Sequence, residues 1–159
     1  MKTLRLKNNI FDYSVNLACI IQLAGIVIYL IAVWGGLPDK IPGHYNATGE
    51  IDRWGSKSEL IVLPIISWLL YMMMTAVEQF PQIWNTGGVT VTEENKYRVT
   101  RILKNMIGTL KLVVVTVFTF ISLNSSRGEA LPVWFMPVFL VLTFAPIIFF
   151  SVKLVRAGS

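Results

Sequence analysis

A polar segment from Leu37 to Glu59 holds the side chains of this chain that are best suited to chemistry. It contains the only histidine, His44, and four of the nine acidic residues. His44 with Asp52 or Glu50 would form a general base with an orienting carboxylate. The same histidine with Glu50, Asp52 and Glu59 would suit a weak hard-cation site or a mixed metal site. The segment therefore offers two reactive interpretations.

The rest of the sequence argues against both reactive interpretations. No motif places a serine or cysteine nucleophile beside His44, and a structural zinc site normally takes four ligands, mostly Cys and His. We therefore expect no catalytic residue, no metal and no cofactor. The third interpretation is a recognition surface for a peptide, a lipid headgroup or a small ligand. The fourth is a loop whose polar groups satisfy one another and close one end of a helix bundle. The candidate ligand-binding residues are His44, Asn46, Glu50, Asp52, Arg53, Trp54 and Lys57.

The composition of the chain places this segment in a membrane protein. Of 159 residues, 54% are hydrophobic and only 14% are charged, whereas a soluble domain carries about a quarter charged residues. The net charge of +5 comes mainly from basic residues beside apolar runs, which is how membrane proteins fix their orientation. We therefore expect the lipid bilayer, and no nucleic acid, as a partner. Cys19 is the single cysteine, so an intramolecular disulfide is excluded.

Four apolar runs predict an all-α fold, a bundle of four transmembrane helices forming a single domain over residues 1–159. Each run is long enough to cross a hydrocarbon core of about 30 Å. In lipid such runs must be helical, because every backbone N–H and C=O needs a partner within the segment. An ordered outer loop over 36–59 follows the first helix, and a cytoplasmic loop over 81–103 follows the second. The predicted spans are about 13–35, 60–80, 104–123 and 131–152.

The distribution of basic residues predicts the orientation. Nine of the fourteen lie on the side of the termini, four lie on the other side, and Lys111 lies within a span. The positive-inside rule then places both termini in the cytoplasm. We expect the protein to lie in the inner (plasma) membrane of the cell. The polar segment from Leu37 to Glu59 faces outward.

Two charged residues fall within or beside the spans. Lys111 lies inside the third span, and Glu78 ends the second at a similar height. Ionisable groups at membrane depth are candidates for function, so a Glu78–Lys111 pair is one interpretation. In the other, Lys111 extends its ammonium to the interface and Glu78 only marks the end of a helix.

Local signals predict where helices begin and bend. Ser56 with Glu59 is a capping box ahead of the second helix, and Thr92 is a candidate N-cap for the third. Pro137 and Pro146 lie inside the fourth span, and each is expected to bend it.

The polar segment also resembles a known family. The pattern Leu37-Pro38-Asp39-x-Ile41-Pro42-x-His44-x-Asn46-x-x-Gly49-Glu50-x-Asp52-x-Trp54-Gly55-Ser56-Lys57, followed by an apolar span with Pro64, is similar to a bacterial membrane domain of unknown function. That domain is found at the N-terminal end of SdpI-type immunity proteins. The resemblance covers the first helix, the loop and the second helix. It departs from the family at Gly43 and Ile51, where a bulkier apolar residue or proline is expected. The chain also lacks the longer C-terminal portion of the immunity proteins.

The resemblance implies a bacterial protein that protects against a membrane-active toxin and holds a soluble protein at the membrane. We therefore expect a non-enzymatic sensing or immunity protein whose outer loop recognises an extracellular peptide or an envelope ligand. The basic start of the third helix would contact a cytoplasmic protein. The alternative is a small membrane enzyme or transporter, using the His/acid site of the loop or the Glu78–Lys111 pair. The motif positions carried over are His44, Asn46, Gly49, Asp52, Trp54 and Lys57.

Overall fold

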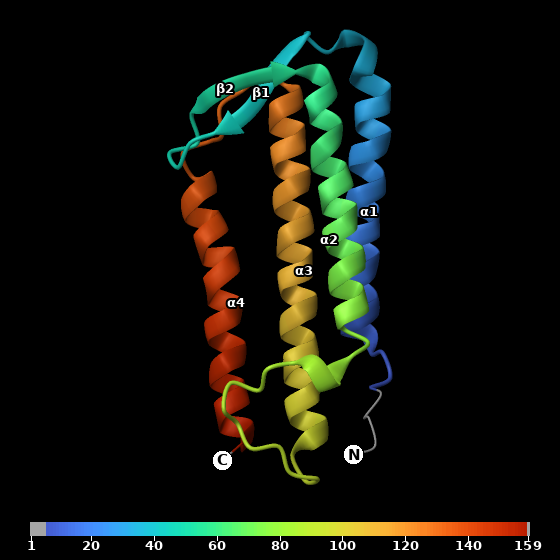
Figure 1. The fold of residues 1–159 in the computed structure, drawn as a ribbon, viewed down its shortest axis with the longest axis vertical. Helices are drawn as coiled ribbons and strands as arrows, with labels where there is room; N and C mark the ends of the chain where they lie inside the picture. Colours follow the sequence, from blue (N-terminus) through green and yellow to red (C-terminus); the bar gives the residue numbers. More distant parts are fainter. Residues whose placement is uncertain (1–5, 159) are drawn as a thin grey trace.

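The computed structural model describes residues 6–158, which form a bundle of long helices with a β-hairpin across one end (Figure 1). Within this range four helices are long and apolar enough to cross a membrane. This confirms the predicted all-α membrane bundle. The long helices are α1 (Ile10–Val33), α2 (Val62–Val77), α3 (Lys96–Ser126) and α4 (Phe135–Gly158). The hairpin strands are β1 (Lys40–Tyr45) and β2 (Ile51–Ser56), and short 3₁₀ turns are η1 (Trp34–Gly36), η2 (Lys57–Ile61) and η3 (Pro81–Ile83).

Helix α3 is the centre of the bundle, because it packs against α1, α2 and α4 (Figure 1). Its Val115 is buried against Val15, Cys19 and Leu23 of α1. At the end away from the hairpin, Val99 and Leu103 of α3 pack against Leu154 and Ala157 of α4. A further cluster joins α1 to the hairpin and η2, and consists of Ile26, Leu30, Ile41 and Leu60.

The predicted outer loop contains an antiparallel hairpin, which sequence reasoning did not foresee. The turn between the strands is built by Asn46, whose side-chain oxygen accepts hydrogen bonds from the backbone N–H of Thr48 and of Glu50. Gly49 completes the turn with φ of 88°, a conformation that is open mainly to glycine. The turn residues were visible in the sequence. The strand pairing was not, because Pro42 and Gly43 are poor strand formers.

Contacts at three points tie the hairpin to the helices. The backbone N–H of Leu131, in the α3–α4 connection, donates to the carbonyl of Gly49 at 2.8 Å. The hydroxyl of Tyr45 lies 3.0 Å from Ser125 Oγ of α3 and donates to the carbonyl of Glu129. The capping box predicted at Ser56 and Glu59 is present and leads from β2 into η2. The hairpin is therefore a fixed cover on the bundle.

Two predicted helix features differ in the structure. Helix α3 begins at Lys96, one turn later than predicted, with Asn95 as its N-cap residue. Thr92 still makes the contacts of a cap, because its hydroxyl accepts the N–H of Asn95 and its carbonyl accepts the N–H of Lys96. Helix α4 begins only at Phe135, so Pro137 lies in its first turn, where a backbone N–H has no helical partner to lose. The predicted interior position of Pro137 is therefore wrong, whereas Pro146 does lie within α4.

Candidate functional site

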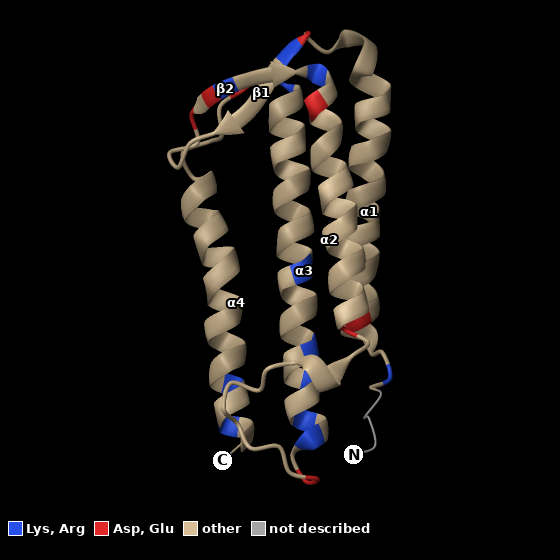
Figure 2. Ribbon diagram, viewed as in Figure 1, with Lys and Arg blue, Asp and Glu red and all other residues tan. Residues whose placement is uncertain are grey.

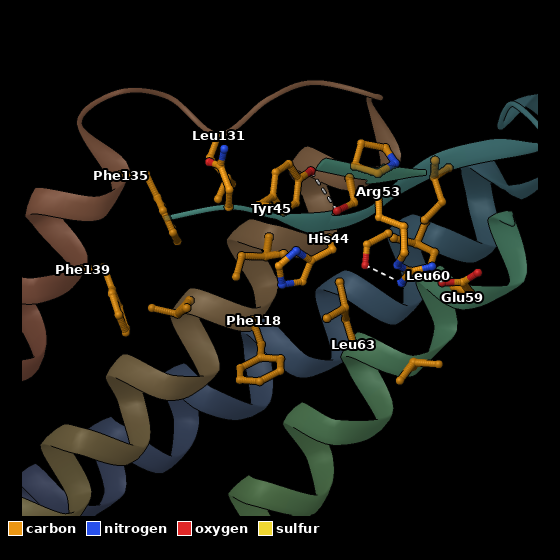
Figure 3. A pocket seen from close by; sticks show the side chains of 18 of the residues that line it. His44, Tyr45, Arg53, Glu59, Leu60, Leu63, Phe118, Leu131, Phe135 and Phe139 are labelled. Carbon is orange, nitrogen blue, oxygen red and sulfur yellow. Dashed lines mark hydrogen bonds and ion pairs between the residues drawn. The ribbon is translucent and has the colours of Figure 1, made fainter. Parts of the chain in front are cut away.

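A pocket of about 720 Å³ lies directly beneath the hairpin (Figure 3). The hairpin forms its roof, and helices α2, α3 and α4 form its walls. The wall side chains are predominantly apolar, whereas the roof contributes polar groups. The wall residues include Leu63, Val117, Phe118, Ile121, Phe135 and Phe139, and the polar residues include His44, Tyr45, Arg53, Glu59 and Ser125. An apolar pocket with a few polar groups at one end is the usual form of a ligand site.

His44 points from β1 into this pocket (Figure 3). The strand register is irregular on both sides of it, between Pro42 and His44 and between His44 and Tyr45, and such bulges redirect a side chain. Its Nδ1 lies 2.6 Å from a carboxylate oxygen of Asp52 on β2. Asp52 thus fixes the orientation of the ring and leaves Nε2 as the nitrogen that remains for a ligand.

Arg53 lies beside His44 and is held by two acceptors. One terminal nitrogen donates to Glu59 at 2.9 Å, and the other donates to the carbonyl of Gly43 at 2.8 Å. The second oxygen of Glu59 accepts the backbone N–H of Ser56 at 3.2 Å. The Glu59 carboxylate therefore has two roles: it caps η2 and it positions the guanidinium of Arg53.

Two glycines make room for the Arg53–Glu59 pair. A Cβ at Gly43 would lie 2.9 Å from Cζ of Arg53, and a Cβ at Gly55 would lie 2.5 Å from the carboxyl carbon of Glu59. Gly43 is one of the positions where the resemblance led us to expect a bulkier residue. Its absence of a side chain allows the guanidinium to lie flat against the strand.

The other predicted loop residues lie apart from the pocket, except Asn46, which lines it. Glu50 accepts a hydrogen bond from Asn46 within the turn. Trp54 is exposed on β2, and the ammonium of Lys57 lies 5.5 Å from the centre of the Trp34 ring. Together with Asp52, these residues form an outer surface of the hairpin and of the adjoining η2.

The four residues considered as metal ligands do not gather at one point. Asp52 pairs with His44, Glu59 with Arg53, and Glu50 with Asn46. In the range 6–158 no three His, Cys, Asp or Glu side chains converge as metal ligands would.

Sequence reasoning missed the pocket residues that come from the helices. Ser125 and Asn124 belong to a buried polar run at the end of α3. The amide of Asn124 donates to the carbonyls of Glu129 and Ala130, which shapes the α3–α4 connection. A run of Asn-Ser-Ser at the end of an apolar span was the available signal. The aromatic wall residues carry no such signal, because Phe is common in any lipid-facing helix.

Lys111 and Glu78 form a second polar site inside the bundle. The ammonium of Lys111 lies 2.8 Å from Glu78 Oε1 and donates to Asn16 at 3.0 Å and to Thr75 at 3.2 Å. The ring of Tyr71 lies 5.3 Å away. The side chain of Lys111 is fully buried, so it does not extend to an interface. The three N–H donors of the ammonium thus face three acceptors: Asn16 of α1, Thr75 of α2 and Glu78 at the end of α2. These contacts join α1 and α2 to α3.

Charge is distributed unevenly between the two ends of the bundle (Figure 2). The end opposite the hairpin is rich in Lys and Arg, whereas basic and acidic residues are interspersed at the hairpin. At the basic end, Asp12 of α1 is buried and lies 2.8 Å from Arg101 and 3.5 Å from Lys104, both of α3. Lys104 also donates to Asn8 at 2.7 Å.

Comparison with known proteins shows similarity without an assigned activity. Residues 21–67, which include the second half of α1, the hairpin and the start of α2, match the family model "Domain of unknown function (DUF1648)". A protein of Archaeoglobus fulgidus, named only as an uncharacterized protein, is 26% identical over 152 residues, covering 85% of this chain and 82% of that protein. No solved structure gives a significant match. The chain is therefore similar to a domain family of unknown function in the region that forms the roof of the pocket.

Proposed function

We propose that this protein is a non-enzymatic, multi-pass protein of the cell membrane that recognises an envelope ligand in the pocket beneath its hairpin. Its role would be sensing or immunity against a membrane-active toxin. The observation that carries the proposal is the pocket itself, with apolar walls within the bundle and a polar roof at the end of it. Such a pocket suits a ligand that is partly apolar and partly polar.

The charge distribution supports an orientation with the hairpin outward. Basic residues gather at the end where α1 begins and α4 ends (Figure 2), and this is the side that the positive-inside rule assigns to the cytoplasm. The pocket would then lie at the outer surface of the membrane, where secreted peptides and envelope lipids arrive. The basic beginning of α3 would face a soluble protein, as the resemblance to SdpI-type proteins implies.

The fixed geometry of the roof supports recognition. The hairpin is tied to η2, to α3 and to the α3–α4 connection, so its polar groups are held in place before a ligand arrives. Such preorganisation lowers the entropy cost of binding.

A survival assay with a filled pocket tests this function. The strains compared produce wild-type protein, no protein, Val117→Trp, or Val141→Trp. Val117 lines the pocket, whereas Val141 is 64% exposed on α4 and serves as a matched lipid-facing control. We expect strains with no protein or with Val117→Trp to be sensitised to at least one peptide of a membrane-active panel, and Val141→Trp to match wild type at equal membrane abundance. Equal survival of all four strains would overturn the proposal.

A second candidate is a small membrane enzyme in which His44 activates water. The 2.6 Å contact between His44 and Asp52, with the ring directed into the pocket, favours it. Purified protein would then release fatty acid from acyl-ester lipids, and His44→Gln would abolish the release. Absence of hydrolysis by wild type would exclude this candidate.

A further inference from the structure

The walls of the pocket define the apolar part of its ligand. Its lining comes from the hairpin and η2, from α2, from α3, and from α4 with its preceding loop. Phe135 and Phe139 of α4 lie on one side of the cavity and Leu63 of α2 on the other, with Phe118 of α3 between them (Figure 3). Helices α2 and α4 both pack against α3, whereas little packing joins them to each other, so the side of the pocket between α2 and α4 is the one open to the surroundings of the bundle. In a membrane those surroundings are lipid, so a hydrocarbon chain can enter sideways.

The residues of the hairpin roof define the polar part of the ligand. Two cationic or hydrogen-bond-donating side chains, His44 and Arg53, meet at one end of the pocket. Each is held by a carboxylate: Asp52 contacts Nδ1 of His44, and Glu59 accepts from one terminal nitrogen of Arg53. Arginine carries five N–H donors, and contacts to Glu59 and Gly43 engage its two terminal nitrogens once each. Further donors of Arg53 can therefore bind one anionic group at the end of the pocket that His44 also lines.

In a bilayer, the acyl chain and the headgroup of a lipid contribute differently to the selectivity of binding. Lipid tails are as apolar as the walls of the pocket, so moving a chain from bilayer to pocket gains little free energy. A hydrogen bond to a charged group is stronger and contributes about ten- to a hundred-fold in affinity. Arginine in particular matches the geometry of phosphate oxygens. Selectivity must therefore come from the headgroup held by the roof.

We infer that the pocket binds an anionic phospholipid, with one acyl chain between α2, α3 and α4 and the phosphate held by Arg53 at the end of the pocket beneath the hairpin. The inference rests on the proposed function and specifies the ligand class of that same site. The phosphate lies at the level of the hairpin, and the chain runs along α3 beside Phe118. Glu59 balances the charge of Arg53 and positions its guanidinium before the lipid arrives, and Asp52 orients the ring of His44.

Photo-labelling with lipids of defined headgroup tests the inference. Full-length protein is reconstituted in nanodiscs of phosphatidylcholine that contain a few per cent of photoreactive phosphatidylglycerol, or of photoreactive phosphatidylcholine with the same chains. Wild type is expected to be labelled by phosphatidylglycerol on peptides from the second half of α3 and the first turns of α4. Labelling by the phosphatidylcholine form is expected to be about tenfold weaker, because its choline cation offsets the phosphate charge and is repelled by Arg53.

Two variants test the headgroup contact, and two others serve as controls. Arg53→Gln removes the charge and is expected to lower pocket labelling by phosphatidylglycerol about tenfold or more. Gly43→Ala keeps every charge but displaces the guanidinium, whose flexible end can move aside, and is expected to lower labelling severalfold. Gly36→Ala is the matched control, because a Cβ at Gly36 meets open space. A Lys153→Gln/Arg156→Gln variant should leave pocket labelling unchanged, which separates the pocket from the basic end.

Defined outcomes would overturn the inference. Equal pocket labelling by the two lipids would show that the site does not select an anionic headgroup. Labelling that is unchanged in Arg53→Gln would show an acyl chain without headgroup recognition. Labelling confined to the basic end would exclude the pocket, and full competition by oleic acid would assign the site to carboxylates. If these results appear while Val117→Trp still sensitises cells to peptides, the lipid inference fails and the proposed function stands with a peptide ligand. If phosphatidylglycerol labels the pocket but all four strains survive the peptides equally, the proposed function fails instead.

Discussion

At Lys111, a single side chain joins three helices. Its ammonium has no exposed surface and contacts one carboxylate, one amide oxygen and one hydroxyl. A buried charge of this kind is tolerated only when its donors are matched and a counter-ion is near. Removing one member leaves the other charge buried without compensation, which costs more than the pair itself contributes. The site is therefore a structural joint between α3 and its neighbours α1 and α2.

The Glu78–Lys111 pair gives a prediction about stability. Glu78→Gln and Lys111→Met should each lower the free energy of unfolding by about 3 kcal/mol. The double variant should be less destabilised than the sum of the two, because no unpaired charge remains. Thermal unfolding of purified protein in detergent measures all four states of this cycle. Strict additivity would contradict a direct pair.

Gly55 gives a second prediction at this scale. A Cβ there would displace the carboxylate of Glu59, which caps η2 and holds Arg53. Gly55→Ala should therefore cost about 1 kcal/mol, the usual effect of a lost cap. Gly35→Ala is the control, since a Cβ at Gly35 has no neighbour within 4 Å. Chemical or thermal denaturation compares the two variants, and equal stability of both with wild type would argue against the capping role.

Among the elements, the hairpin is the one that converts a helix bundle into a covered pocket. An isolated two-stranded hairpin is marginal in water, so its order must come from its contacts. Those contacts are the backbone bond from Leu131 to Gly49, the Tyr45 hydroxyl on Ser125 and Glu129, and the capping box into η2. The order of the hairpin therefore depends on the helix ends to which it is tied.

Tyr45→Phe tests this dependence. Loss of the hydroxyl should destabilise the hairpin by about 1 kcal/mol, because Ser125 and the carbonyl of Glu129 lose a partner. Hydrogen exchange should show faster exchange of the strand amides in β1 and β2, with little change within α1. Tyr13→Phe, at an exposed tyrosine of α1, is the control. Unchanged exchange in the hairpin would show that its order does not depend on Tyr45.

For the whole molecule, the central position of α3 and the two unlike ends are the dominant features (Figures 1 and 2). Helix α4 is the least buried of the four spans, with 11% of its most apolar window buried, against 22% for α1 and α3. Its contact with the rest is mainly through α3. This arrangement leaves the pocket bounded by α2 and α4 on opposite sides, at the end where charges are mixed.

The proposed orientation gives a prediction for the whole molecule. Thr48→Cys places a thiol at the exposed hairpin turn, and Glu94→Cys places one in the exposed turn before α3. A membrane-impermeant maleimide added to intact cells should label the first variant and should label the second only after permeabilisation. Wild type is the control, because Cys19 is fully buried. The reverse pattern would place the hairpin in the cytoplasm.

The sequence by itself determined the four helical spans, the polar connection between the first two and the capping box at Ser56. These follow from local chemistry: an apolar run in lipid must satisfy its backbone internally, and a cap acts within one turn. Only the tertiary structure decided that His44 and Arg53 face a pocket while Trp54 and Lys57 do not. It also decided that Gly43 admits the guanidinium, and that Lys111 meets Asn16 and Thr75 as well as Glu78. Those outcomes depend on strand register and on the alignment of helices far apart in the chain, which no short stretch of residues encodes.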